Sequence, residues 1–246
     1  MDKATEAVSR YAAELRFEDL PRSTVHDTKR KLIDALGCAI GAFDDEPCRI
    51  ARAIARRCVG NPPARIFGTQ EMSTPEHAAF ANGVMVRSQD YNDSYLSSAS
   101  SHPSDTLSGV LALADATGAD GKAVITATVL AYEVACNFAD VLQREQGFDN
   151  TFYGVIASAA AGGKLLGLTA ERITHAIALA VTPNVTLGQT RLGELSMWKG
   201  CAAANGVRNG VFAAIAAQHG LTGPDQPIEG RWGLRNVLGD FEWAAF

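Results

Sequence analysis

The densest group of polar side chains lies between residues 90 and 105. It reads Asp90-Tyr91-Asn92-Asp93-Ser94-Tyr95 and, after a serine-rich turn, Ser101-His102-Pro103-Ser104-Asp105. A carboxylate and an imidazole at the two sides of one loop can divide the removal and the delivery of a proton, so Asp90 and His102 are the candidate acid–base pair. Such residues also fasten ordered loops to the backbone, which leaves a structural role open. For Ser104 and Asp105, at an expected helix start, capping is the simpler interpretation.

Two residues elsewhere have side chains suited to a binding site. Arg191 precedes an alanine-rich helical segment and can grip a carboxylate, although a solvated loop charge explains it equally well. Tyr153 follows a turn at Asp149-Asn150-Thr151, where an aromatic side chain either lines a cleft or packs in the core. No glycine-rich phosphate-binding pattern follows a strand, so no nucleotide cofactor is predicted.

The segments that must position these residues are helical. Apolar residues recur at helical spacing, and Thr74-Pro75-Glu76 is a helix start signal. Gly118, Gly147, Gly167 and Gly220 stand where helices should end. Helices are expected over residues 3–15, 23–43, 49–58, 75–85, 105–116, 121–142, 153–166, 169–181 and 198–219.

The fold class predicted from this pattern is all-α. Strand-like alternation is confined to short pieces such as residues 64–68, and no hairpin signal is evident. Several helical faces consist of Ala and Gly, as in residues 157–163, which allows helix axes to approach closely. The chain is expected to form one helical domain over residues 1–246. Its core should cover about residues 1–222, and residues 223–246 should begin a connection to a further domain.

The composition narrows the class of protein. The chain has 246 residues, a net charge of -5 and no clustered Lys or Arg, so nucleic acid is not an expected partner. The amino terminus lacks an apolar signal segment and later apolar stretches are interrupted by charges, which predicts a cytoplasmic protein without a membrane span. An odd set of cysteines without zinc-ligand spacing predicts small buried thiols and no metal site: Cys38, Cys48, Cys58, Cys136 and Cys201.

The polar motif also resembles that of a known family. Residues 90–94 followed by 102–105 are similar to the D-[FYH]-N-D-[TS]…H-P-S-D signature of the MmgE/PrpD family, which includes 2-methylcitrate dehydratase, cis-aconitate decarboxylase and epimerases. Residues 31–38 resemble its early helix, residues 160–168 its AKLLGL helix, and residues 197–200 its lysine-bearing loop. The resemblance covers nearly the whole chain in the right order.

This resemblance implies a large helical domain followed by a smaller α/β lid domain, with the active site between them. This chain is expected to hold only the helical domain, so a lid is missing or belongs to a separate chain. The resemblance further implies a homodimer and catalysis without an iron–sulfur cluster or other cofactor. Its site residues correspond here to Asp90, Ser94, His102 and Lys199, and Asn150 stands where a second histidine is usual.

The chemistry that this resemblance implies is dehydration of a small hydroxy-polycarboxylate such as 2-methylcitrate. Such a reaction removes a proton beside a carboxylate, stabilises the charge that forms and protonates the departing hydroxyl. Our hypothesis gives acid–base work to Asp90 and His102, orientation to Asn92 and Ser94, and carboxylate binding to Lys199. Asn150, Tyr153 and Arg191 complete the expected substrate-binding set. An epimerase, a decarboxylase and a non-catalytic domain that needs a partner chain remain alternatives.

Overall fold

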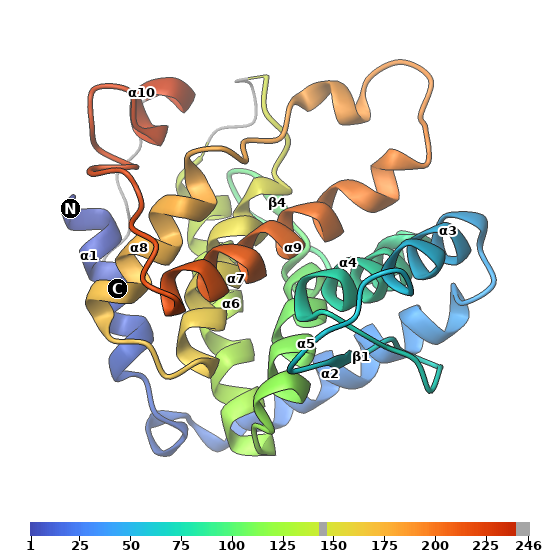
Figure 1. The fold of residues 1–246 in the computed structure, drawn as a ribbon. Coiled ribbons are helices and arrows are strands. Elements are labelled where there is room, and N and C mark those ends of the chain that lie inside the picture. The colour runs from blue at the N-terminus through green and yellow to red at the C-terminus, as the bar shows by residue number, and fades with distance from the viewer. Residues whose placement is uncertain (143–146, 240–246) are drawn as a thin grey trace.

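The computed structural model describes residues 1–142 and 147–239, and within these residues the protein is a stack of helices (Figure 1). The all-α prediction is confirmed. The α-helices are α1 Lys3–Glu14, α2 Arg22–Gly41, α3 Glu46–Ala55, α4 Pro75–Arg87, α5 Leu107–Thr117, α6 Gly121–Val141, α7 Phe152–Leu165, α8 Ala170–Val181, α9 Trp198–Gln218 and α10 Leu234–Leu238. Short 3-10 turns are η1 Phe17–Asp19, η2 Pro103–Thr106 and η3 Gly188–Arg191.

The helix boundaries follow the predicted signals. Pro75 begins α4 directly after Thr74, and the Thr169 hydroxyl accepts a hydrogen bond from the Arg172 amide at the start of α8. Gly118 and Gly167 follow helices in the left-handed conformation, with φ of 65° at both, which glycine adopts without steric cost. The third helix was predicted three residues too late, because Pro47 in the first turn of α3 is itself a start signal.

Helix α7 lies in the middle of the stack, against α6, α8 and α9 (Figure 1). Residues 152–163 are all buried, and small side chains let α9 approach closely. A Cβ atom added to Gly210 of α9 would lie 2.4 Å from the Val155 carbonyl oxygen of α7, so only glycine fits there. The predicted close approach of small-residue faces is therefore seen at this helix crossing.

Two short antiparallel hairpins were not predicted. β1 Ala64–Arg65 pairs with β2 Met72–Ser73, and β3 Tyr95–Leu96 pairs with β4 Ser100–Ser101. Two-residue strands are too short to show alternation in the sequence, so only the strand-like character of residues 64–68 was visible. The second hairpin gives the polar loop a defined shape.

The segment after α9 returns to the other end of the chain. The backbone amide of Ile228 donates to Asp2 Oδ2 over 2.8 Å, and the amino terminus forms an ion pair with Asp225. Ile228, Leu234 and Leu238 are buried in the same apolar cluster as α1. The C-terminal part of the described chain thus packs on the helical core.

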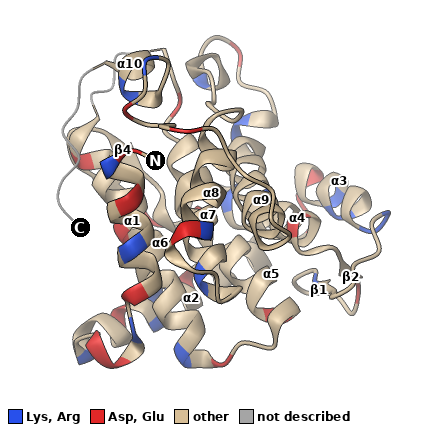
Figure 2. Cartoon of the chain, turned by 60° about the vertical axis from the view of Figure 1, so that its left-hand side comes forward, with Lys and Arg blue, Asp and Glu red and all other residues tan. Residues whose placement is uncertain are grey.

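Among the described residues, α6 is long and apolar enough to cross a membrane by length and composition. Its most apolar window is 61% buried inside the protein, as expected of a core helix. Acidic and basic residues are interspersed over the visible helices (Figure 2).

Candidate active site

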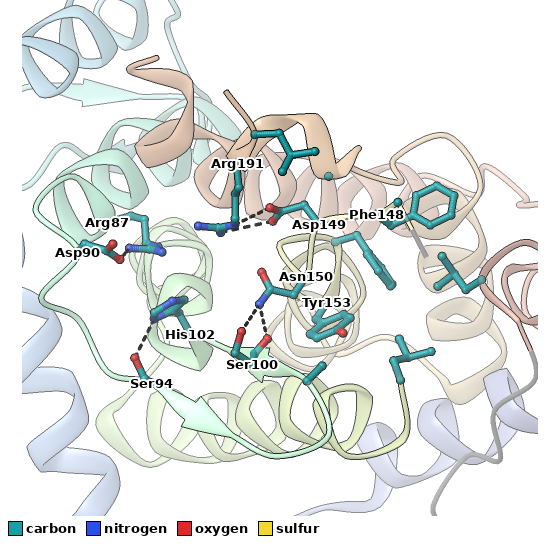
Figure 3. Close-up of a pocket in the computed structure, with 17 residues that line it drawn as sticks. Arg87, Asp90, Ser94, Ser100, His102, Phe148, Asp149, Asn150, Tyr153 and Arg191 are labelled. Carbon is teal, nitrogen blue, oxygen red and sulfur yellow. Dashed lines mark hydrogen bonds and ion pairs between the residues drawn. The ribbon is translucent and has the colours of Figure 1, made fainter. Parts of the chain in front are cut away.

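A cavity of about 740 Å³ opens where the end of α4, the β3–β4 hairpin, the start of α7 and η3 meet (Figure 3). Six of the predicted site residues line it: Asp90, Ser94, His102, Asn150, Tyr153 and Arg191. Further residues of the lining are Arg87, Ala99, Ser100, Leu142, Gly147, Phe148, Asp149, Phe152, Gly188, Leu192 and Leu238. Segments distant in the sequence therefore converge on one hollow with both polar and apolar walls.

His102 stands at the start of η2 with its ring held on one side. Its Nδ1 atom lies 2.7 Å from the Asp93 carbonyl oxygen and 3.3 Å from the Ser94 hydroxyl. Because a carbonyl oxygen only accepts, Nδ1 carries the hydrogen, and Nε2 keeps its lone pair without a hydrogen-bond partner among the described residues. Burial, and next the charge of Arg87, lower the pKa of His102. At neutral pH the ring is an uncharged base.

Asp93 supports this arrangement from behind. Its carboxylate accepts hydrogen bonds from the Tyr132 hydroxyl over 2.8 Å and from the Ser104 amide over 3.0 Å. Lys31 Nζ lies 3.2 Å from the same carboxylate. These contacts fix the carbonyl that orients His102, a role for Asp93 that the sequence motif did not reveal.

Asp90 lines the cavity beside Arg87, on the same side as His102 (Figure 3), and its backbone is in the left-handed conformation, with φ of 59°. Arg87 donates a hydrogen bond to one carboxylate oxygen, and Lys199 Nζ donates to the other over 3.0 Å. Burial alone would raise the pKa of Asp90, but these two cations lower it to about 2. Asp90 is therefore an anion at neutral pH. Asp90 and His102 line the same cavity, whereas Lys199 is not among the residues that line it and is connected to it through its contact with Asp90.

Asn92 lies behind the cavity wall instead of in the lining. Its side chain is buried, and its amide nitrogen donates to the Ser104 hydroxyl and to Asp105 Oδ1, each over 2.9 Å. Asn92 was predicted to orient the substrate, but the structure does not place its side chain where it would contact a substrate directly. Its contacts instead tie the polar loop to the start of η2, because buried amide groups need partners.

Arg87 was missed in the sequence, although it stands three residues before Asp90. Its side chain is only 2% exposed, and its Nε atom lies 3.7 Å from Asp105 Oδ1. Burial raises the pKa of Asp105 to about 7 despite this neighbour. The guanidinium therefore lies between a fully buried carboxyl group and the cavity carboxylate of Asp90. The sequence did offer a signal for Arg87, because it is a cation at the C-terminal end of a helix that is otherwise mostly apolar.

The opposite wall is built by two segments that run side by side. Phe148 and Leu187 form an antiparallel bridge, and the Asp149 amide donates to the Thr186 carbonyl oxygen over 2.9 Å. This pairing brings Arg191 Nε within 2.5 Å of the buried Asp149 carboxylate. Arg191 is thus a fixed cation of the cavity and not a solvated loop charge. Asp149 was not predicted as its anchor, because the two residues are 42 positions apart.

Asn150 and Tyr153 form the wall near the hairpin. The Asn150 amide nitrogen donates to the Ser100 carbonyl oxygen and, over 3.0 Å, to its hydroxyl, which joins α7 to β4. The Tyr153 ring stacks on Phe138 with 5.6 Å between centroids. Burial raises the pKa of Tyr153 to about 12, and its hydroxyl has no hydrogen-bond partner in the described part of the chain. Tyr153 both lines the cavity and packs, so the two predicted interpretations apply together.

The comparison with known proteins bears on this arrangement. The family model of the MmgE/PrpD N-terminal domain matches residues 6–244. The chain belongs to the MmgE/PrpD family. One relative is the 2-methylcitrate dehydratase of Cupriavidus necator, which is 31% identical over 91% of this chain and 49% of its own length. Another is the 2-methylcitrate dehydratase of Escherichia coli K12, which is 33% identical over 84% of this chain and 46% of its own length. The probable 2-methylcitrate dehydratase of Saccharomyces cerevisiae is 29% identical over 96% of this chain and 49% of its own length.

The MmgE/PrpD chain described here spans about half the length of the curated relatives it matches. The matched half corresponds to the N-terminal helical domain of the family. All five cysteines are free thiols. Cys48 and Cys201 are buried, as predicted, and burial raises the pKa of both. Cys38, Cys58 and Cys136 are only partly buried, so the prediction of buried thiols is wrong for these three. Within the described ranges no group of three or more His, Cys, Asp or Glu is arranged to hold a metal ion.

Proposed function

We propose that this chain supplies the acid–base half of a dehydratase that acts on a small hydroxy-polycarboxylate such as 2-methylcitrate. The observation that carries the proposal is His102, an uncharged imidazole with a free Nε2 in a cavity that also holds fixed cations. The names of the relatives support the reaction type. An α/β lid, on this protein or on a separate chain, would complete the site and select the substrate.

The proposed reaction begins at His102 Nε2, which takes a proton from the carbon beside a substrate carboxylate. The electron pair left behind is shared with that carboxylate, whose added negative charge Arg191 and Lys199 stabilise. The pair then forms the double bond as the hydroxyl departs. The imidazolium at His102 returns its proton to this hydroxyl, which leaves as water. One residue can make both transfers when proton and hydroxyl depart from the same face.

Asp90 has a different part in this proposal from the one expected of it. With a pKa of about 2 it holds no proton to deliver at neutral pH, so we assign it to hold Arg87 and Lys199 in place. A substrate carboxylate would compete with Asp90 for Lys199, which is one-third exposed. Ser94 and Tyr153 offer hydroxyl groups to the substrate.

The test is proton exchange in D₂O. We expect the chain to exchange the carbon-bound proton of 2-methylcitrate, followed by nuclear magnetic resonance, and His102→Gln to slow exchange by about 10²–10⁴. His219→Gln, an exposed histidine outside the cavity, is the matched control and should exchange at the wild-type rate. Equal exchange by the His102→Gln and wild-type proteins would refute the role of His102.

Two further readouts separate the alternatives. Formation of a conjugated alkene identifies a dehydratase, whereas exchange with inversion and without alkene identifies an epimerase, and release of CO₂ a decarboxylase. Calorimetric titration should show saturable polycarboxylate binding that Lys199→Met weakens by about tenfold, because one ion pair in a partly enclosed site is lost. Absence of both exchange and saturable binding would overturn the proposed function and favour a non-catalytic domain.

A further inference from the structure

The cavity is charged at one end and apolar at the other. Arg87, Asp90 and His102 lie on one side of Asn150, and the Phe148 ring lies on the other side (Figure 3). Four large side chains of the lining belong to one buried apolar cluster, against which Phe148 also packs: Leu142, Phe152, Tyr153 and Leu238. The apolar end of the cavity is therefore an opening in the core of the domain.

An apolar wall of this kind suits an uncharged group and not a carboxylate. A carboxylate brought there would lose its hydration and gain no hydrogen-bond partner from the wall except the Tyr153 hydroxyl. An alkyl group, in contrast, gains about fourfold in affinity for each methylene that it buries. The cavity volume of about 740 Å³ is in the upper part of the range of about 300–1,000 Å³ usual for small-molecule sites, so a charged and an apolar group fit together.

Leu238 brings a distant part of the chain to this wall. Among the described lining residues, it is the one that follows α9 in the sequence. Leu238 ends the five-residue helix α10 and is 2% exposed. At the start of that helix, the Leu234 amide donates to the Pro227 carbonyl oxygen and the Arg235 amide donates to that of Ile228, each over 2.9 Å. The place of Leu238 in the cavity therefore depends on residues 227 and 228.

Asp2, near the other end of the chain, holds that segment. Its side chain is buried, and Oδ2 accepts hydrogen bonds from the amides of Ile228 over 2.8 Å and Glu229 over 3.1 Å. Oδ1 accepts from the Thr5 amide over 2.8 Å at the start of α1. Hydrogen bonds to a charged acceptor are about twice as strong as those between neutral groups. One oxygen of Asp2 thus caps α1, and the other fixes the segment that carries Leu238.

We propose that Leu238 limits the size of the uncharged side group that the substrate carries, and that Asp2 is the positioning residue for Leu238. This inference rests on the proposed function, because it assigns the apolar end to the methyl group by which 2-methylcitrate differs from citrate. Leu142 and Phe152 adjoin α6 and α7 in the central stack of helices. Leu238 is therefore the part of the wall whose size can change without repacking that stack.

Calorimetric titration of the full chain with citrate, 2-methylcitrate and 2-butylcitrate tests the role of Leu238. Leu238→Ala should raise the preference for 2-butylcitrate over citrate by about tenfold, because it opens space for further methylenes, and Leu238→Phe should lower that preference. Leu234→Ala is the matched control, since Leu234 is a buried leucine of the same helix outside the lining. It should keep the wild-type preference. A loss of folded protein weakens binding of all three acids alike and leaves their affinity ratios unchanged.

Asp2→Asn tests the positioning role. The substitution places an amide group where two oxygens accept hydrogen bonds, so the segment that carries Leu238 is released. We expect the preference for 2-butylcitrate to shift in the direction of Leu238→Ala, and the double variant to show no further shift. Thr5→Val is the control, because it removes a hydroxyl that contacts Asp2 but leaves the contacts of Asp2 with residues 228 and 229 intact. It should retain the wild-type preference.

The possible failures can be told apart. An unchanged preference in both Leu238→Ala and Leu238→Phe would overturn the role of Leu238, although the acids still bind. Independent, additive shifts from Asp2→Asn and Leu238→Ala would overturn the positioning role of Asp2. A wild-type chain that binds none of the three acids would overturn the proposed function, and this inference with it.

Discussion

The buried carboxyl group of Asp105 should make the folded protein less stable as pH rises toward neutrality. Burial raises its pKa from the ordinary value of 3.8 to about 7 in the folded protein. The folded state therefore binds more protons than the unfolded state between these values, and stability falls as pH increases through that window. Asp105→Asn removes the titrating group while retaining an oxygen that can accept the hydrogen bond from Asn92.

The size of the effect follows from the two pKa values. One pKa unit corresponds to about 1.36 kcal/mol, so titration of Asp105 should cost about 2.5 kcal/mol between about pH 5 and about pH 8. The free energy of unfolding of the wild type should decline by that amount relative to Asp105→Asn over the same range. Urea denaturation at several pH values, followed by circular dichroism, gives this difference directly.

A matched control separates this group from the other carboxylates. Glu133→Gln removes an exposed carboxylate of α6 and, measured in the same way, controls for the loss of a negative charge that is not buried. If Asp105→Asn and wild type showed parallel pH dependence, the inference that burial dominates over the nearby Arg87 would be wrong.

Three further predictions concern the cavity and the core. The exchange rate should fall as pH drops below the ordinary imidazole pKa, because protonation removes the base at His102. Since the charge of Arg87 lowers the pKa of His102, Arg87→Gln should move the inflection of the pH–rate profile to higher pH. An unshifted midpoint in this variant would contradict the influence of Arg87. Gly210→Ala should lower the unfolding free energy by about 1–3 kcal/mol through overlap with the Val155 carbonyl, whereas Gly121→Ala, which meets nothing within 4 Å, should be close to neutral in urea denaturation. Arg191→Ala should lower the free energy of unfolding by about 3 kcal/mol, because it leaves the buried Asp149 carboxylate without its ion-pair partner. The double variant Asp149→Asn/Arg191→Ala should recover part of that loss in urea denaturation. If it recovers none, the unpaired carboxylate is not the cause of the destabilisation.

The helices were predictable because their signals are local. Thr74-Pro75 and the glycines after α5 and α7 mark boundaries through the conformations that those residues favour. The polar motif likewise located the loop of Asp90 and His102. The roles of the residues inside that loop were not predictable. Asn92 and Asp93 are adjacent, yet the Asp93 carboxylate is held in place behind His102, whereas the Asn92 amide is hydrogen-bonded behind the cavity wall.

The contacts that escaped prediction join residues far apart in the sequence. Nothing in the residues around 149 indicates that its carboxylate will meet Arg191, since the meeting depends on how the segments at 147–149 and 186–188 pair. Burial of Arg87 and Asp105 depends in the same way on α4, α5 and α6 packing together. Their perturbed electrostatics therefore belong to the assembled domain and not to the motif.

The cavity walls also have a consequence for the order in which the domain folds. Asn150 reaches Ser100 across 50 positions, and Lys199 reaches Asp90 across 109. Contacts that close such long loops are costly in chain entropy, so the hollow should be among the last parts of the domain to form. Newly synthesised protein would then form the hollow in one late step, and partly folded molecules would lack it.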